Sequence, residues 1–167
     1  MWHLECLRRT GQKDSNYIVQ LTRAADYAVR VMIHLAGMPV GSRASRAELA
    51  SAAECPEQFL SKVLQNLTRA GLVISHRGNT GGFELPRMHR NASILDVVEA
   101  IEGPIRLNLC LIAEQSCNRQ ERCPAHGVWA EAQRAMAAVL QRATVGELAQ
   151  QTPHDPQEPG AGAVPWN

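Results

Sequence analysis

Aromatic residues are scarce in this chain of 167 residues, where Phe, Trp and Tyr together make up 4%. This scarcity argues against an aromatic-rich β sandwich. The 45% hydrophobic share favours helices that pack through Ala, Leu and Val side chains. The length fits one domain, or one domain with an appendage.

The chain also lacks any apolar run long enough to cross a membrane, and residues 1–9 lack the apolar core of a secretory signal. Its five cysteines are an odd number. We therefore expect a cytoplasmic protein with no membrane contact. In a reducing compartment, cysteines serve metal or redox roles more often than structural disulfides.

Enzyme signatures are missing as well. The sequence contains no evident pair of catalytic carboxylates and no Ser/His/Asp set. The glycine-rich stretch Arg77-Gly78-x-x-Gly81-Gly82 lacks the Lys-Ser/Thr of a nucleotide-binding loop. The sequence therefore predicts a protein that is not an enzyme and has no small-molecule substrate.

Positive charge is concentrated in the first half of the chain, although the net charge is only +1. Between residues 58 and 90 a single acid, Glu84, accompanies five bases: Lys62, Arg69, Arg77, Arg87 and Arg90. Between residues 96 and 158 there are nine acids and five bases. This asymmetry indicates that the first half meets a polyanion, the alternative being an ordinary solvated surface.

Helical periodicity begins near residue 21. Thr22 is the expected N-cap of a first helix, whose apolar stripe ends before Gly37. Ser45 and Glu48 form a capping box for a short second helix, in which each residue hydrogen-bonds the main chain of the other.

A third helix is expected from Pro56, which suits a first turn, to Gly71, which suits a left-handed C-cap. Two short strands should follow at residues 72–75 and 83–85, joined by a flexible glycine-rich turn. This order predicts a mostly α fold with a small β wing, a winged helix-turn-helix domain over residues 21–103. The buried face of the third helix is expected to contain Phe59, Leu60, Val63, Leu64 and Leu67.

The opposite face of that helix and the wing are the expected DNA contacts. Gln and Ser side chains read base edges, Lys neutralises phosphate, and an arginine on the wing suits a narrow minor groove. Wing glycines let the backbone approach DNA closely. The complete expected set, including the start of the first helix, is Thr22, Arg23, Gln58, Ser61, Lys62, Gln65, Arg77, Gly81 and Gly82.

Three cysteines, Cys110, Cys117 and Cys123, fall within fourteen residues, and His126 follows three positions later. Thiolates at this density favour zinc, cuprous ion or an iron–sulfur cluster. The spacing of six and then five residues is looser than a Cys-x-x-Cys zinc knuckle and suits a larger cluster, the alternative being free or disulfide-paired thiols. Cys55, in contrast, is expected in the core.

A long amphipathic helix is expected after the cysteines, from about Pro124 to Arg142. Its apolar stripe is more than a small winged domain can cover. A symmetric dimer is the simplest partner, against the alternative that the helix packs on its own domain. Residues 104–150 are therefore expected to form a cysteine loop and a dimerisation helix.

The two ends of the chain are expected to lie outside the fold. Residues 1–20 show no helical or strand period and are expected to form a flexible extension, with the natural start near Val19. Residues 151–167 are rich in Pro and Gly and are expected to be disordered.

Three stretches resemble one known family. The first is Leu21-Thr22-Arg23-Ala-Ala-Asp26-Tyr27-Ala28, and the second runs through the third helix and the wing to Gly81-Gly82-Phe83. The third is the cysteine loop with its Cys123-x-x-His126-x-x-Trp129 ending. Over about four-fifths of its length, the chain is similar to the Rrf-two family of winged-helix iron–sulfur regulators of bacteria, of the IscR, NsrR and RirA type.

The resemblance implies a homodimer that binds a double-stranded DNA operator with dyad symmetry and carries one [2Fe–2S] or [4Fe–4S] cluster per subunit. Cluster state would then set DNA affinity, with Cys110, Cys117 and Cys123 as ligands. Both His126 and Asp26 of the other subunit are candidates for the fourth ligand, and we favour His126 because it lies close to Cys123 in the chain. The alternative is a thiol- or zinc-based redox switch, or a cluster carrier, that does not act on DNA.

Overall fold

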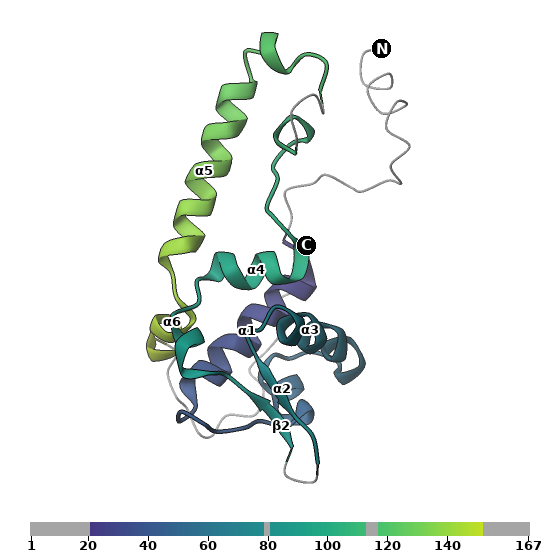
Figure 1. Ribbon diagram of the computed structural model, residues 1–167, viewed down its shortest axis with the longest axis vertical. Coiled ribbons are helices and arrows are strands. Elements are labelled where there is room, and N and C mark those ends of the chain that lie inside the picture. The colour runs from purple at the N-terminus through teal and green to yellow at the C-terminus, as the bar shows by residue number, and fades with distance from the viewer. Residues whose placement is uncertain (1–20, 79–80, 113–116, 152–167) are drawn as a thin grey trace.

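The computed structural model describes residues 21–78, 81–112 and 117–151. Within them lie six α-helices, a two-stranded antiparallel sheet and three short 3-10 helices (Figure 1). In chain order these are α1 (Arg23–Gly37), α2 (Arg46–Ala52), α3 (Glu57–Arg69), β1 (Ile74–His76), β2 (Gly82–Glu84), η1 (Arg87–Asn91), α4 (Ile94–Glu102), η2 (Leu109–Leu111), η3 (Gln120–Arg122), α5 (His126–Arg142) and α6 (Val145–Gln151).

The predicted extension and almost all of the predicted tail fall outside these described residues. Gln151, which we assigned to the tail, is instead the last residue of α6. None of the described helices combines the length and the apolar character needed to cross a bilayer.

Helices α1, α2, α4 and α6 begin where the sequence places capping residues. Thr22 Oγ1 accepts a hydrogen bond from the Ala25 amide at 3.4 Å, at the start of α1. In α2, Ser45 Oγ accepts from the Glu48 amide at 3.2 Å, and the Glu48 carboxylate accepts from the Ser45 amide at 2.6 Å. The same reciprocal bonds begin α4 and α6. They satisfy amides that have no partner inside the helix, and those of α1 and α2 confirm the predicted starts.

Helix α3 ends as predicted, in a left-handed turn at Gly71, where φ is 77°. The Gly71 amide donates to the Thr68 carbonyl and the Leu72 amide to the Leu67 carbonyl, both at 3.0 Å. These two bonds close the last turn of the helix and direct the chain into the wing.

The strands of the wing are shifted from their predicted positions. β1 begins two residues later than predicted, at Ile74, where the pairing with β2 starts opposite Glu84. Leu72 and Val73 before it are buried in the core. β2 begins one residue earlier, at Gly82. Phe83 in β2 also exchanges main-chain hydrogen bonds of 2.8 and 3.0 Å with Ala44, so the wing is attached to the segment that leads into α2.

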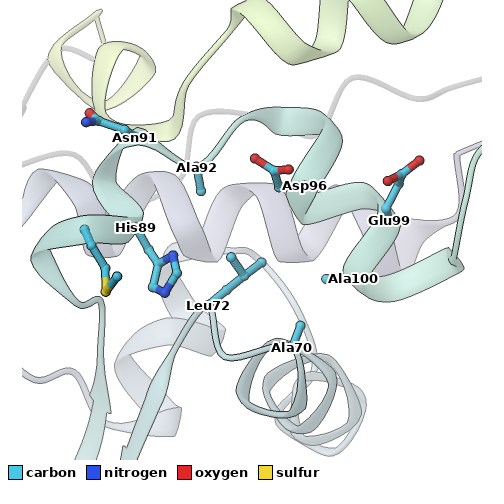
Figure 2. Close-up of a pocket in the computed structure, with 9 residues that line it drawn as sticks. Ala70, Leu72, His89, Asn91, Ala92, Asp96, Glu99 and Ala100 are labelled. Carbon is cyan, nitrogen blue, oxygen red and sulfur yellow. The ribbon is translucent and has the colours of Figure 1, made fainter.

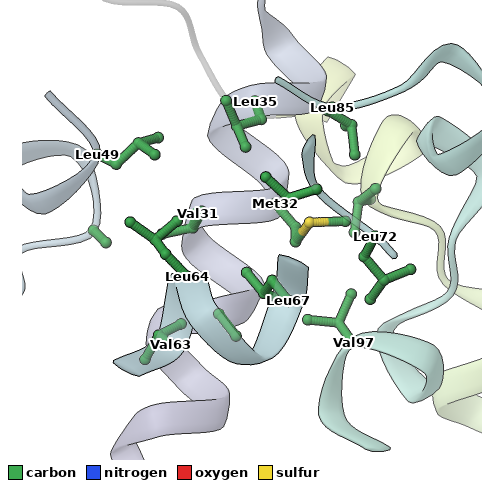
Figure 3. Packing of buried hydrophobic residues seen from close by; sticks show 14 of the residues in the cluster. Val31, Met32, Leu35, Leu49, Val63, Leu64, Leu67, Leu72, Leu85 and Val97 are labelled. Carbon is green, nitrogen blue, oxygen red and sulfur yellow. The ribbon is translucent and has the colours of Figure 1, made fainter. Parts of the chain in front are cut away.

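One hydrophobic core joins α1, α2, α3, α4 and α6 (Figure 3). Fully burying one such aliphatic side chain is worth roughly 1.5–3 kcal/mol, so this core fixes the orientation of α3. Cys55 lies in it, 7% exposed, as predicted. Its largest buried side chains include Val31, Met32 and Leu35 of α1, Leu49 of α2, Leu60, Val63, Leu64 and Leu67 of α3, and Val97 of α4.

Phe59 does not belong to this buried face, so that prediction was wrong. It is 41% exposed. Its ring meets Tyr27 edge-on, with centroids 5.7 Å apart and planes 73° apart. The position lies on the flank of α3, where an aromatic ring covers the rim of the core without entering it.

Helix α5 extends away from the winged domain (Figure 1). It begins at His126, two residues later than predicted, and none of its residues is buried. Val128, Trp129 and Val139 are 64%, 42% and 57% exposed. Leu140, near the end of the helix, packs against the core, whereas these three apolar side chains lack cover from the described part of the chain.

Candidate DNA-binding surface and cysteine site

The face of α3 that points away from the core carries an exposed polar ridge. Gln58, Lys62, Gln65 and Arg69 follow one another at intervals of four, three and four residues, and all four are exposed. Positions at this spacing lie above one another on a helix. The ridge contains three predicted DNA contacts and adds Arg69.

A groove of about 750 Å³ lies between α3 and the wing. Its lining brings together three predicted contacts, Ser61, Gln65 and Arg77, and adds Arg46 and Arg69. The sequence carried a signal for Arg69, which follows Gln65 by four positions on the same helix. It carried none for Arg46, which only the packing of α2 against α3 brings to the groove.

Lys62 and Thr22 line a neighbouring hollow of about 390 Å³, between the start of α1, α3 and the end of α4. Thr22 is engaged there in holding the fold. Its hydroxyl caps α1, and its amide donates to Glu102 Oε1 at 2.7 Å. Arg23 and Gln58 are exposed and line neither hollow.

The wing glycines have structural reasons to be glycine. A Cβ added at Gly81 would lie 2.4 Å from the His76 carbonyl oxygen. A Cβ at Gly82, where φ is 151°, would lie 2.7 Å from the Ala44 carbonyl oxygen. Both glycines therefore let the hairpin close and attach to the segment before α2.

Three cations of this surface lack an acidic partner among the described residues. Lys62, Arg69 and Arg77 form no ion pair with any residue that the structure describes. The only acid among the wing's described residues, Glu84, lies 2.7 Å from His76 Nε2 and 3.8 Å from Arg43 Nε. The free positive charge on this face suits an anionic partner.

Arg90 differs from those cations, although the charge pattern grouped it with them. Its guanidinium donates to the carbonyl of Ala36 at 2.5 Å and to that of Met38. These are the last carbonyls of α1, where a cation is favourable because the helix dipole is negative. Its charge therefore stabilises the end of α1 and is not part of the exposed basic surface.

A further hollow, of about 550 Å³, lies beyond the end of α3, between η1 and α4 (Figure 2). Leu72, His89, Asp96 and Glu99 are among the residues that line it. Asp96 Oδ2 also accepts a hydrogen bond of 2.8 Å from the amide of Ser93, the N-cap of α4. The lining contains no Lys or Arg, so this hollow is not part of the basic surface.

The three clustered cysteines are free thiols. Cys110 is buried in η2, whereas Cys117 and Cys123 are half-buried. Burial raises the pKa of the Cys110 thiol, and the charges of Cys117 and Cys123 raise it further. Burial alone raises the pKa of Cys55, which lies apart from them.

His126 adjoins this group at the start of α5, where its amide donates to the Cys123 carbonyl at 3.1 Å. Its ring Nδ1 is buried and has no hydrogen-bond partner in the described residues. Buried polar atoms normally have a partner, so this nitrogen marks a place that another group can complete. Three thiols and one imidazole are a donor set that fits zinc or an iron–sulfur cluster.

The described side chains are not drawn together around a metal. No three His, Cys, Asp or Glu residues among them lie close enough to hold a metal ion. Residues 113–116, between Cys110 and Cys117, lie outside the described part of the chain. The structure therefore supports the donor set by its chemistry and burial and shows no coordination geometry.

Asp26, the other candidate ligand, lies on the exposed side of the first turn of α1. Its Oδ2 is 3.0 Å from Arg30 Nη2. Arg30 in turn reaches Glu54 Oε2 at 3.4 Å. The Asp26 carboxylate is therefore engaged by a guanidinium of its own helix.

A helix-turn-helix with an exposed polar ridge and an attached basic hairpin defines a winged-helix protein. The profile of the Rrf2 family, described as an iron-dependent transcriptional regulator, matches residues 21–151. The chain belongs to this family and is a transcriptional regulator.

Relatives and solved structures agree with this assignment. Protein aau3 of Rhizobium meliloti (strain 1021) is 36% identical over 137 residues, which cover 81% of this chain and 88% of that protein. The HTH-type transcriptional regulator NsrR of Shouchella clausii is 30% identical over 131 residues, covering 78% and 88%. CymR, the global cysteine regulator of B. subtilis, has a similar structure, with a TM-score of 0.65 and 26% identity over 81% of this chain and 99% of that one. The predicted winged-helix fold is thereby confirmed.

Proposed function

We propose that this regulator binds operator DNA as a homodimer and that an iron–sulfur cluster held by Cys110, Cys117 and Cys123 controls its affinity. The observation that carries the DNA-binding part is the groove between α3 and the wing, where a polar helix face meets Arg69 and Arg77, which form no ion pair with any described residue. The cluster part rests on the three free thiols and the buried, unpartnered Nδ1 of His126.

In this proposal, α3 lies in the major groove of DNA. Gln58 and Gln65 on its ridge have the amide groups that read base edges, and Lys62 and Arg69 neutralise phosphates. Arg77 on the wing then reaches the backbone or a narrow minor groove. Gly81 and Gly82 act indirectly, because they let the hairpin close against Ala44.

The homodimer rests on α5. A helix without buried residues, with Val128, Trp129 and Val139 exposed, is stabilised by packing against another apolar surface. A second copy supplies the same stripe through two-fold symmetry. The dimer would then place two α3 helices on an operator with dyad symmetry, in half-sites roughly 34–36 Å apart.

The side chains in the cysteine segment are of the types that bind an iron–sulfur cluster. A bound cluster would supply iron that responds to redox change, nitric oxide or iron supply. Cys110, Cys117 and Cys123 would hold it. Between the candidates for the fourth ligand, the structure favours His126, because its Nδ1 is free while Asp26 is paired with Arg30.

The test combines spectroscopy with DNA binding. Protein purified without oxygen should be coloured and should contain iron and acid-labile sulfide, and its affinity for a genomic operator fragment should change when the cluster is removed. Colourless protein without iron, expressed with ample iron, contradicts the cluster. Binding that is no stronger to any genomic fragment than to random DNA contradicts the operator.

A second candidate function keeps the DNA binding and uses zinc or the bare thiols as the switch. The observation in favour of the bare thiols is that no three metal-binding side chains of the described residues are gathered for coordination, and zinc is a candidate because three thiols and one imidazole are a donor set that it binds. Zinc in the purified protein, or operator affinity that responds to thiol oxidation without any metal, would support it. A thiol switch or cluster carrier without DNA binding has no use for the basic groove.

A further inference from the structure

The segment that leads from α4 to Cys110 has no regular secondary structure before η2, and side chains of two helices hold its main chain. Gly103, with φ of 78°, ends α4. Two residues later the Ile105 amide donates to Glu99 Oε1 of α4 at 3.4 Å. The Leu107 amide then donates to Gln133 Oε1 of α5 at 3.1 Å, across 26 positions of sequence.

The bond to Gln133 joins this segment to α5. It is partly buried, and Leu107 lies three positions before the buried Cys110. A main-chain amide outside helices and sheets depends on such an acceptor, because an unpaired buried N–H is costly. Downstream, the Leu111 amide donates to the Asn108 carbonyl at 3.0 Å, which forms the turn of η2 that carries Cys110.

We propose that Gln133 is a positioning residue that fastens the Cys110 segment to α5 and so couples the state of the cysteines to that helix. This inference rests on the proposed function, in which the cysteines control DNA binding and α5 sets the dimer. When the segment is attached, a structural change at Cys110 is transmitted to α5. When it is detached, the cysteine loop and the helix respond independently.

The experiment measures how fast each thiol reacts in the full-length protein, reduced and freed of metal by a chelator. N-ethylmaleimide is added for timed intervals, and mass spectrometry quantifies the labelling of each cysteine. Gln133→Ala should label Cys110 about five-fold faster than wild type, because losing one hydrogen bond makes local opening more frequent. Cys55, buried in the core apart from α5, reports on global unfolding and should be unchanged.

Two matched variants sharpen this test. Gln133→Glu keeps an oxygen acceptor for the Leu107 amide and should restore the wild-type rate. Gln141→Ala removes an exposed glutamine from the same helix and should leave Cys110 unaffected. Equal Cys110 rates in wild type and Gln133→Ala, a parallel rise at Cys55, or no rescue by Gln133→Glu would each overturn the proposal.

A second measurement addresses the coupling itself. The ratio of operator affinities between metal-loaded and metal-free protein should fall about five-fold in Gln133→Ala. The hydrogen bond from the Leu107 amide to Gln133 would transmit part of the difference in affinity between the two states. An unchanged ratio together with faster Cys110 labelling would overturn the coupling. Because labelling is measured without DNA, a failure of operator binding is distinguishable from a failure of the Gln133 attachment.

Discussion

Arg77 carries a charge that no other described side chain neutralises, at the edge of the groove between α3 and the wing. We expect Arg77→Ala to lower operator affinity by about 1–3 kcal/mol, because a cation that contacts phosphate or the minor groove is lost. Fluorescence anisotropy with a labelled operator measures the change.

The control for this prediction is Arg142→Ala, which removes an exposed arginine at the end of α5. It changes the net charge by the same amount as Arg77→Ala. Its affinity should stay close to that of the wild type. If both variants lose affinity equally, net charge explains the effect and Arg77 has no special position.

His126 and Asp26 differ in what their side chains already touch. The Nδ1 atom of His126 is buried and has no hydrogen-bond partner among the described residues, whereas Asp26 is paired with Arg30 at 3.0 Å. We therefore expect His126→Ala to shift the anaerobic absorption spectrum of the protein and Asp26→Ala to leave it unchanged. The opposite result would assign the fourth position to Asp26 of the partner subunit.

The helices of the DNA-binding domain rely on reciprocal caps, and α2 offers the clearest test. Hydrogen bonds from the main chain and side chain of Ser45 lower the pKa of Glu48. The folded pKa lies below the unfolded value near 4.5, so this contribution is present above that pH and lost as the pH falls through the lowered pKa.

We expect Ser45→Ala to reduce the free energy of unfolding by about 1 kcal/mol at pH 7, because the start of α2 loses its cap. The difference from wild type should shrink between pH 7 and pH 3, as the pH falls toward the lowered pKa of Glu48. Urea denaturation at the two pH values measures both. Ser51→Ala, an exposed serine inside α2, should be nearly neutral at either pH. A difference that stays constant with pH would contradict the role of Glu48.

At the scale of the elements, the helices were predictable and the wing was only partly so. Caps such as Ser45–Glu48 and the C-cap Gly71 act over three or four residues, so their pattern is visible in the sequence. The start of β1 was misplaced because Leu72 and Val73 have strand composition, whereas the pairing with β2 begins only at Ile74, opposite Glu84. The short turns η1, η2 and η3 were not predicted, since 3-10 turns lack a strong periodic signal.

For the whole molecule, α5 decides the assembly. We expect Val139→Glu to convert a dimer to monomer, because two-fold symmetry repeats the charge in the interface. Val139 is 57% exposed within one chain, so the substitution should leave the monomer folded. Sedimentation measures the mass, and circular dichroism checks the fold.

Gln141→Glu is the matched control, an added charge at another exposed position of α5. It should remain dimeric, because a polar side chain already stands there. A wild-type protein that sediments as a monomer would contradict the dimer, and so would an unaltered dimer in Val139→Glu.

The sequence by itself determined the helix order, the caps, the polar face of α3 and the grouping of the three cysteines. Each depends on residues that are close along the chain or share one helix face. Only the tertiary structure decided that Arg46 joins the groove, that Arg90 is engaged by the end of α1, and that Leu107 is fastened to Gln133. Those contacts join residues far apart in sequence, and the packing of several helices together sets them.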